Sequence, residues 1–176
     1  PAWIRKLQTD SLTLSERMKL EIPVSEATIR AFWLAAGGST LAGRHALRDG
    51  FSANLGGGFH HAYPGHGEGF CMLHDVAIAL RSLQAAGAIR TAMVVDTDVH
   101  QGNGTAAIFE DDHSVFTLSI HQENNYPLPK PPSNEDIGLA DGTRDHEYLD
   151  ALEEGLLHSL KKMTPDLIFY VAGADP

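Results

Sequence analysis

The sequence predicts an α/β fold with three layers, α/β/α, built around a mostly parallel β-sheet. Three short apolar runs support this prediction, at 92–95, 114–120 and 167–172. Each run is almost continuously apolar, which is typical of strands buried on both faces. Segments with helical periodicity separate the runs, and strands that alternate with helices form parallel sheets covered by helices on each side.

Helical periodicity is present on both sides of the first strand. One helix is predicted from Ser25 onward, and the Gly37-Gly38 pair inside it indicates tight packing or a break. A second helix is predicted over 75–86, and a later one has its apolar stripe over 149–163. The glycines of 101–105 indicate a tight turn into a further helix.

Two segments carry little secondary-structure pattern. Residues 1–25 show only a short amphipathic piece around 12–20, and 122–142 form a loop rich in Pro and Asn that is long for a simple connection. The chain has no internal repeat. We therefore expect a single domain over 1–176, with 1–25 as a poorly patterned lead-in and 26–176 as its core.

The composition excludes several classes of partner. The formal net charge is −10, from 13 basic and 23 acidic residues, which argues against binding to a nucleic-acid backbone. No apolar stretch approaches the roughly 18 residues that span a bilayer, so we expect no membrane partner. Cys71 is the only cysteine, which excludes a disulfide framework and favours a reducing cytoplasm. The chain begins at Pro1 without Met, so an upstream signal peptide stays open.

Polar residues follow each predicted strand directly. Asp96, Asp98 and His100 follow the first strand, His121 the second and Asp175 the third. The carboxyl ends of parallel strands meet at one sheet edge, where ligands bind in open α/β sheets. Asp98 and His100 leave the same face of extended backbone about 7 Å apart, so both could reach one ion, and Asp175 could supply a third ligand. Such a triplet also occurs in plain strand-end turns, and both interpretations stay open here.

Two adjacent histidines follow a glycine-rich loop at 54–58 (NLGGG). Flexible glycines allow the backbone to place both imidazoles, of His60 and His61, in one pocket. Imidazole is also the side chain whose ordinary pKa lies nearest 7, as a general acid or base requires. Histidines are common as ordinary core or surface residues too, so a structural role stays open as the alternative.

Together these motifs resemble the histone deacetylase superfamily. That group includes eukaryotic deacetylases, acetoin-utilisation proteins and acetylpolyamine amidohydrolases, and its domain has the arginase/deacetylase fold. The bacterial branch is most similar, through 121–127 (HQENNYP) and 130–133 (KPPS). The resemblance runs from about residue 26 to the last residue. The four motifs that match in order and spacing are 56–61 (GGGFHH), 67–71 (GEGFC), 96–105 (DTDVHQGNGT) and 173–175 (GAD).

The resemblance implies a zinc site with a pair of histidines beside it. Asp98, His100 and Asp175 match the zinc ligands of the family. His60 and His61 match the tandem histidines next to the water that the metal activates. Of the two, His61 matches the general base more closely.

The resemblance also implies roles for residues around the metal. Asp96 matches the carboxylate that orients the first histidine. Asn103 stands where some members have Asp behind the second histidine, so the proton affinity of His61 is expected to be lower. Phe70 matches an aromatic wall of the acyl-lysine channel, and Tyr126 lies in the segment expected to form its rim. The positions that match a structural potassium site are Asp96, Asp98, His100, Ser119 and Ile120.

The function implied by the resemblance is a zinc-dependent deacetylase, an amidohydrolase acting on acylated lysine, polyamine or a similar small molecule. Fe²⁺ is the alternative metal, because Asp₂His ligation accepts both ions. An oligomer is compatible with the sequence. The family's Gly-Gly-Tyr segment, which supplies the tyrosine for the oxyanion, has no match in this chain. The fold is therefore expected to be incomplete and the chain alone a poor enzyme.

Two other interpretations fit parts of the sequence. A truncated, non-catalytic metal-binding relic or scaffold is favoured by the missing Gly-Gly-Tyr segment. A binuclear-manganese ureohydrolase is suggested by the shared fold, but such sites need additional Asp and His ligands. The tandem histidines at 60–61 and the segment 67–71 fit a deacetylase better.

Overall fold

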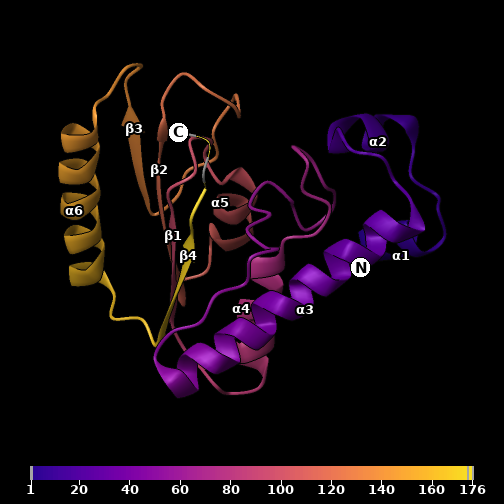
Figure 1. Cartoon of the computed structure of the whole chain (residues 1–176), viewed down its shortest axis with the longest axis horizontal. Helices are drawn as coiled ribbons and strands as arrows, with labels where there is room; N and C mark the ends of the chain where they lie inside the picture. Colours follow the sequence, from indigo (N-terminus) through magenta and orange to yellow (C-terminus); the bar gives the residue numbers. More distant parts are fainter. Residues whose placement is uncertain (1, 174, 176) are drawn as a thin grey trace. The chain divides into compact units, whose positions relative to one another are not determined.

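The predicted parallel sheet forms in the second of two compact units into which the chain divides, Pro1–Leu83 and Gln84–Pro176. The structure is a computed structural model that describes residues 2–173 and residue 175. Its four strands lie in the order β3-β2-β1-β4, and every neighbouring pair is parallel (Figure 1). The strands are β1 (Ala92–Asp96), β2 (Val115–Gln122), β3 (Glu135–Leu139) and β4 (Leu167–Val171).

Two helices of this unit cover the sheet on opposite sides (Figure 1). Helix α6 (Asp145–Lys162) contacts β2 and β3, and α5 (Asn103–Phe109) contacts β2. Leu156 of α6 packs against a buried cluster that includes Met93 and Phe116, because alternate residues of each strand point to this face. The predicted α/β class and its layered, parallel arrangement are confirmed.

The strands differ in burial, which corrects one expectation. All of β1 and nearly all of β2 are buried, as predicted. In β4, however, Ile168 and Tyr170 are exposed, although its apolar run predicted burial on both faces. Among the described residues β4 pairs with β1 alone, so it is an edge strand. An edge position leaves part of an apolar strand exposed whatever its composition.

Strand β3 lies inside the segment that was predicted to be a loop. The sequence Glu135–Leu139 (EDIGL) has only two apolar side chains, Ile137 and Leu139, and contains a glycine, so its alternation is too short to indicate a strand. Pairing with β2 defines it, with Ile120 opposite Ile137. The loop predicted over 122–142 is therefore interrupted by a strand at Glu135–Leu139, which the sequence did not predict because a tertiary partner determines it.

The first unit contains α1 (Ala2–Gln8), α2 (Leu14–Leu20), α3 (Glu26–Asp49) and most of α4 (Asp75–Ala85). The predicted lead-in thus holds two helices, and Trp3, Leu7, Leu12 and Leu20 are buried in one cluster with Phe32. A capping box between Thr13 and Glu16 fixes the start of α2. Both helices are too short to repeat the helical spacing of apolar residues several times, so the sequence pattern did not predict them fully.

Helix α3 runs through the Gly37-Gly38 pair without a break. A Cβ at Gly38 would lie 2.9 Å from Nδ2 of Asn54, so the glycine permits close packing, which was one of the two predicted outcomes. The helix predicted over 75–86 matches α4. Over the described ranges, none of the helices combines the length and the apolar character that crossing a membrane requires.

Candidate metal centre

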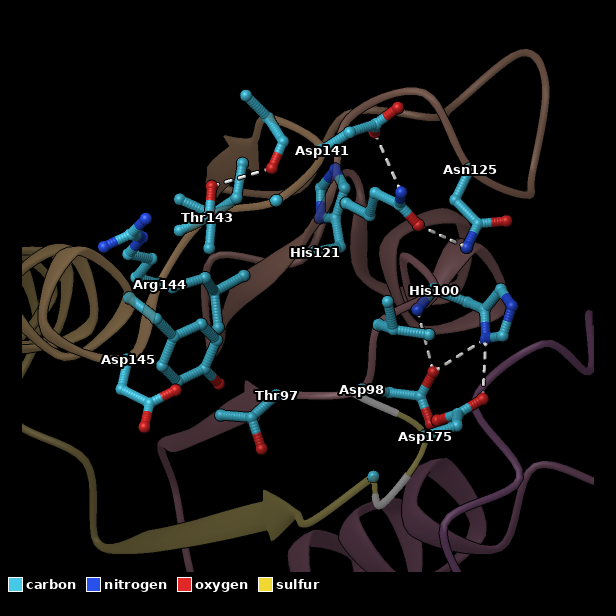
Figure 2. Close-up of a pocket in the computed structure, with 18 of the residues that line it drawn as sticks. Thr97, Asp98, His100, His121, Asn125, Asp141, Thr143, Arg144, Asp145 and Asp175 are labelled. Carbon is cyan, nitrogen blue, oxygen red and sulfur yellow. Dashed lines mark hydrogen bonds and ion pairs between the residues drawn. The ribbon is translucent and has the colours of Figure 1, made fainter.

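Three of the predicted ligands meet at the carboxyl edge of the sheet. Asp98 and His100 follow β1, and Asp175 follows the adjacent parallel strand β4. His100 Nδ1 lies 3.0 Å from Asp98 Oδ1 and 3.2 Å from Asp175 Oδ2 (Figure 2). One donor atom from each residue lies within 4.8 Å of the others. The structure thus brings together residues that are 77 positions apart in the sequence (175 − 98).

The backbone of residues 96–100, which carry the candidate ligands Asp98 and His100, is held by the side chains of Asp96 and Asp98. Asp96, which is only 2% exposed, accepts a hydrogen bond from Asp98 N at 3.2 Å. Asp98 Oδ1 in turn accepts one from His100 N at 2.8 Å. Aspartate side chains that accept from the backbone two residues further on fix tight turns. The loop therefore presents the Asp98 carboxylate and the His100 imidazole in a defined orientation.

Gly173 allows the end of β4 to approach this loop. A Cβ at Gly173 would collide with Cα and Cβ of Asp98. The amide and hydroxyl of Thr97 both donate to Val171 O at 3.1 Å, which ties the two strand ends together. Any side chain at position 173 would thus displace a predicted ligand. Its motif neighbour Ala174 lies outside the described residues.

The donor set suits a divalent cation. Ligand atoms 2.0–2.2 Å from a tetrahedral ion are about 3.3–3.6 Å from one another. The 3.0 and 3.2 Å separations from His100 Nδ1 to the two carboxylates are close to that range. Two carboxylates and an imidazole leave further positions open for water or substrate, as in catalytic zinc sites. These residues could hold a zinc ion.

A cavity of about 890 Å³ in the second unit opens onto these side chains. Its wall continues from the three candidate ligands to the end of β2 and the first turn of α6 (Figure 2). Burial lowers the pKa of His121 in this wall, and its Nδ1 lies 3.0 Å from Ser119 Oγ. Burial raises the pKa of Tyr148. Both groups are thus neutral at pH 7 and available for hydrogen bonding.

In the first unit, Asp75 holds the glycine-rich loop that precedes the tandem histidines. Its carboxylate accepts hydrogen bonds from Gly58 N at 3.0 Å, from Phe59 N at 2.8 Å and from the hydroxyl of Ser39. A carboxylate that accepts several backbone N–H groups forms strong, charge-assisted hydrogen bonds. The backbone immediately before His60 is therefore fixed.

His60 and His61 themselves are buried, and their ring centroids lie 4.0 Å apart. The backbone of Gly69 packs on the second ring, because a Cβ at Gly69 would lie 2.9 Å from Cδ2 of His61. Phe70 follows, at the tip of a tight turn with φ of 65° and an exposed ring. A left-handed conformation is unfavourable for a bulky residue, and such positions cluster at functional sites.

A third buried histidine of the first unit, His74, was not predicted from the sequence. His74 is buried, and its Nδ1 accepts a hydrogen bond from Ala77 N at 3.1 Å at the start of α4. Burial, together with His60 and His61, lowers the pKa of His74 to about 3. The available sequence signal was its place directly before the helix at Asp75, where a side-chain acceptor caps the first turn.

Comparison with known proteins identifies the family. The sequence profile of the Histone deacetylase domain matches residues 2–176. The chain belongs to the histone deacetylase family. The match begins well before residue 26, where the resemblance in the sequence was expected to start, and so includes the helices α1 and α2.

One sequence relative and two solved structures show how similar this member of the histone deacetylase family is to known proteins. An uncharacterized protein of Picosynechococcus sp. is 42% identical over 99% of the chain. A crystal structure of a histone deacetylase homologue from Aquifex aeolicus superposes with a TM-score of 0.77 at 26% identity over 96% of the chain. An acetylpolyamine aminohydrolase from Burkholderia pseudomallei gives 0.69 at 29% over 84%. The chain spans 58% of the first relative and 50% and 47% of the two solved chains.

Several roles expected within the histone deacetylase family stay predictions. Asp96, the last residue of β1, is the cross-strand partner of Ser119 in β2, next to Ile120, which suits the predicted potassium site without testing it. The expected pairings of Asp96 with His60 and of Asn103 with His61 join residues of the two units. Asn103 is buried at the first residue of α5.

Proposed function

We propose that this protein is a zinc-dependent deacetylase that hydrolyses the amide bond of an acylated amine. The clustering of Asp98, His100 and Asp175 around His100 Nδ1 is the observation that supports it most strongly. Membership of the histone deacetylase family supports the reaction class. Fe²⁺ could take the place of zinc, because the same donors accept both ions.

The tandem histidines carry the proton transfers in this proposal. Zinc, when bound, makes water a better nucleophile near neutral pH and polarises the amide carbonyl. His61 accepts the proton from the attacking water and delivers it to the leaving amine. His60 lies beside the same water in this proposal and is oriented by Asp96, and Asn103 leaves the proton affinity of His61 lower than a carboxylate would. Phe70 forms a wall of the acyl channel.

A structural potassium ion is proposed beside the metal. It would be held by the ends of β1 and β2, partly through backbone carbonyl oxygens. Such an ion would fix the loop that carries Asp98 and His100. The proposed ligands are Asp96, Asp98, His100, Ser119 and Ile120.

The proposed substrates are acyl-lysine, acylated polyamine and small acylamides. The net charge of −10 is compatible with a substrate that carries an amine. None of the tyrosines at 63, 126, 148 and 170 matches the family's oxyanion donor, and loss of one such donor costs about 10²–10³ in rate. We therefore expect slow turnover by the chain alone. A metal-binding scaffold without activity is the second candidate function.

Hydrolysis of an acetyl-lysine peptide and of an N-acetylpolyamine by the zinc-loaded chain tests the proposal. Replacement of His61 by Ala should lower the rate by about 10²–10⁴, because general acid–base catalysis contributes that much. His113→Ala, at an exposed histidine, should leave it unchanged. Zinc binding without any hydrolysis by the wild-type chain would favour the scaffold, and equal rates for His61→Ala would overturn the proposed base.

A further inference from the structure

The segment between β2 and β3 is fastened at several points although it lacks regular structure. We call residues 123–134 the proline-rich loop. Lys130 Nζ donates to Asn125 O at 2.6 Å and to Pro127 O at 3.1 Å, which closes the loop on itself. Thr117 N donates to Asn134 Oδ1 at 2.8 Å, which anchors the end of the loop to β2.

Gln101 provides the connection between this loop and the metal-site segment. It directly follows His100 in the sequence and is only 1% exposed. Its Nε2 donates to Pro131 O at 2.7 Å and to Asp136 Oδ1 at 2.8 Å. The other carboxylate oxygen of Asp136 accepts a hydrogen bond from Ser133 N at 2.7 Å. Asp136 therefore binds both the Gln101 side chain and the backbone near the end of the loop.

Only one half of the Gln101 amide forms hydrogen bonds among the described residues. Its Oε1 is buried and has no hydrogen-bond partner among the described residues. A buried acceptor without a partner is destabilising, and an apolar side chain of the same size would avoid that cost. The two hydrogen bonds from Nε2 are therefore the evident contribution of the amide at this position.

The fastened loop carries an aromatic side chain against the candidate metal ligand. The ring of Tyr126 stands edge-on to the imidazole of His100, with centroids 6.2 Å apart and an interplanar angle of 68°. Tyr126 is 37% exposed, so one part of its ring remains open to solvent. An edge-to-face aromatic contact restricts the orientation of both rings.

We propose that Gln101 is a positioning residue that fixes the proline-rich loop beside His100 and keeps Tyr126 against that imidazole. The His100 orientation set in this way determines how strongly Asp98, His100 and Asp175 hold their metal. This second part rests on the proposed function. Residues that orient a metal ligand commonly change metal affinity by about 10–100-fold when they are replaced.

Two variants of Gln101 separate its hydrogen bonds from its volume. Gln101→Met keeps the length and removes the donor, and Gln101→Glu keeps the shape but faces Pro131 O and Asp136 with an acceptor. Gln84→Met is the matched control, because Gln84 Nε2 also donates twice in the same unit, to Ser114 Oγ at 2.9 Å and to Arg90 O at 3.3 Å. Tyr126→Leu changes only a partly exposed ring, so folding is not at risk.

Two quantities are measured on the full chain. One is the hydrogen exchange of the peptide 122–136, and the other is the zinc affinity, from competition with a chromophoric chelator. Both Gln101 variants should exchange at least about tenfold faster in this peptide and bind zinc about 10–100-fold more weakly. Tyr126→Leu should weaken zinc binding several-fold while the loop stays protected. Gln84→Met should change neither quantity.

Unchanged loop exchange in the Gln101 variants would overturn the proposal. A loosened loop with wild-type zinc affinity would overturn the link to His100, as would unchanged affinity in Tyr126→Leu. If the wild-type chain bound no zinc, the proposed function would fail instead, and hydrogen exchange would still decide whether Gln101 fixes the loop.

Discussion

Asp98 has two roles at the candidate metal centre, since one of its carboxylate oxygens accepts from His100 N and also faces His100 Nδ1. Replacement by Asn keeps the shape but removes the negative charge that a divalent ion requires. We expect Asp98→Asn to weaken zinc binding by more than about 100-fold, beyond the range for residues that only orient a ligand. Chelator competition on the purified chain measures this.

Asp145→Asn is the control for that measurement. Asp145 lines the same cavity but does not belong to the three-residue cluster. Its replacement removes one charge from the same wall and should change zinc affinity by less than about threefold, as expected for a screened surface charge. Equal losses in the two variants would show that general electrostatics, and not direct ligation, controls binding.

Because His74 is buried, we expect the stability of the first unit to depend on pH. Its pKa is lowered from 6.5 to about 3 by burial and by His60 and His61, so the folded state excludes a proton that the unfolded state binds. Its contribution is complete above pH 6.5 and is lost as the pH falls toward 3. Within that window the free energy of unfolding should fall by about 1.4 kcal/mol for each unit by which the pH is lowered.

The His74→Asn variant tests this dependence, because Asn also accepts from the backbone at a helix start but does not titrate. Urea unfolding at pH 4.5, 5.5 and 6.5, followed by the fluorescence of Trp3 and Trp33, reports on the first unit, which contains both tryptophans. The variant should lose stability less steeply on acidification. Parallel curves for variant and wild type would disprove the assignment, and His113→Asn should match wild type.

At the residue scale, the sequence predicted the candidate metal ligands but not the buried residues that hold the backbone around the site residues. Asp98, His100 and Asp175 follow apolar runs, and parallel strands bring such positions to one edge. His74 and Gln101 have ordinary sequence surroundings. Their importance depends on burial and on partners such as Pro131 O, which only the folded chain defines.

At the element scale, the glycine-rich loop gives a prediction with an internal control. A Cβ at Gly57 would collide with Asp75 and lie 2.8 Å from Ser39 Oγ, whereas at Gly56 the nearest atom, Asn54 Oδ1, is 3.9 Å away. We expect Gly57→Ala to lower the unfolding free energy by about 1–3 kcal/mol, as overpacking usually does. Gly56→Ala should be within about 0.5 kcal/mol of wild type.

Urea unfolding of the two glycine variants measures the difference. Gly57→Ala should also accelerate hydrogen exchange at Gly58 and Phe59, because their amides donate to Asp75. If the two variants had the same stability, the loop would not be held by Asp75 as the contacts indicate.

The elements that the sequence predicted are those with a strong period of their own. Helix α6 has a long apolar stripe and strands β1 and β2 are nearly continuous apolar runs, and the structure confirms all three elements. Strand β3 and helix α1 are short, and each is defined by a partner distant in the sequence: β2 for the strand, and the cluster around Leu20 and Met72 for the helix. Local pattern cannot show such partners.

At the scale of the whole molecule, the described part of the sheet has the apolar strand β4 at one edge. Within the described residues β4 pairs only with β1, and its Ile168 and Tyr170 are 45% and 63% exposed. Unpaired apolar edges promote contact between chains, and a lysine at the edge opposes it. Light scattering over a range of protein concentrations should therefore show self-association that Ile168→Lys reduces. Leu128→Lys, at an exposed loop position, should not reduce it, and equal association of all three proteins would contradict a role for β4.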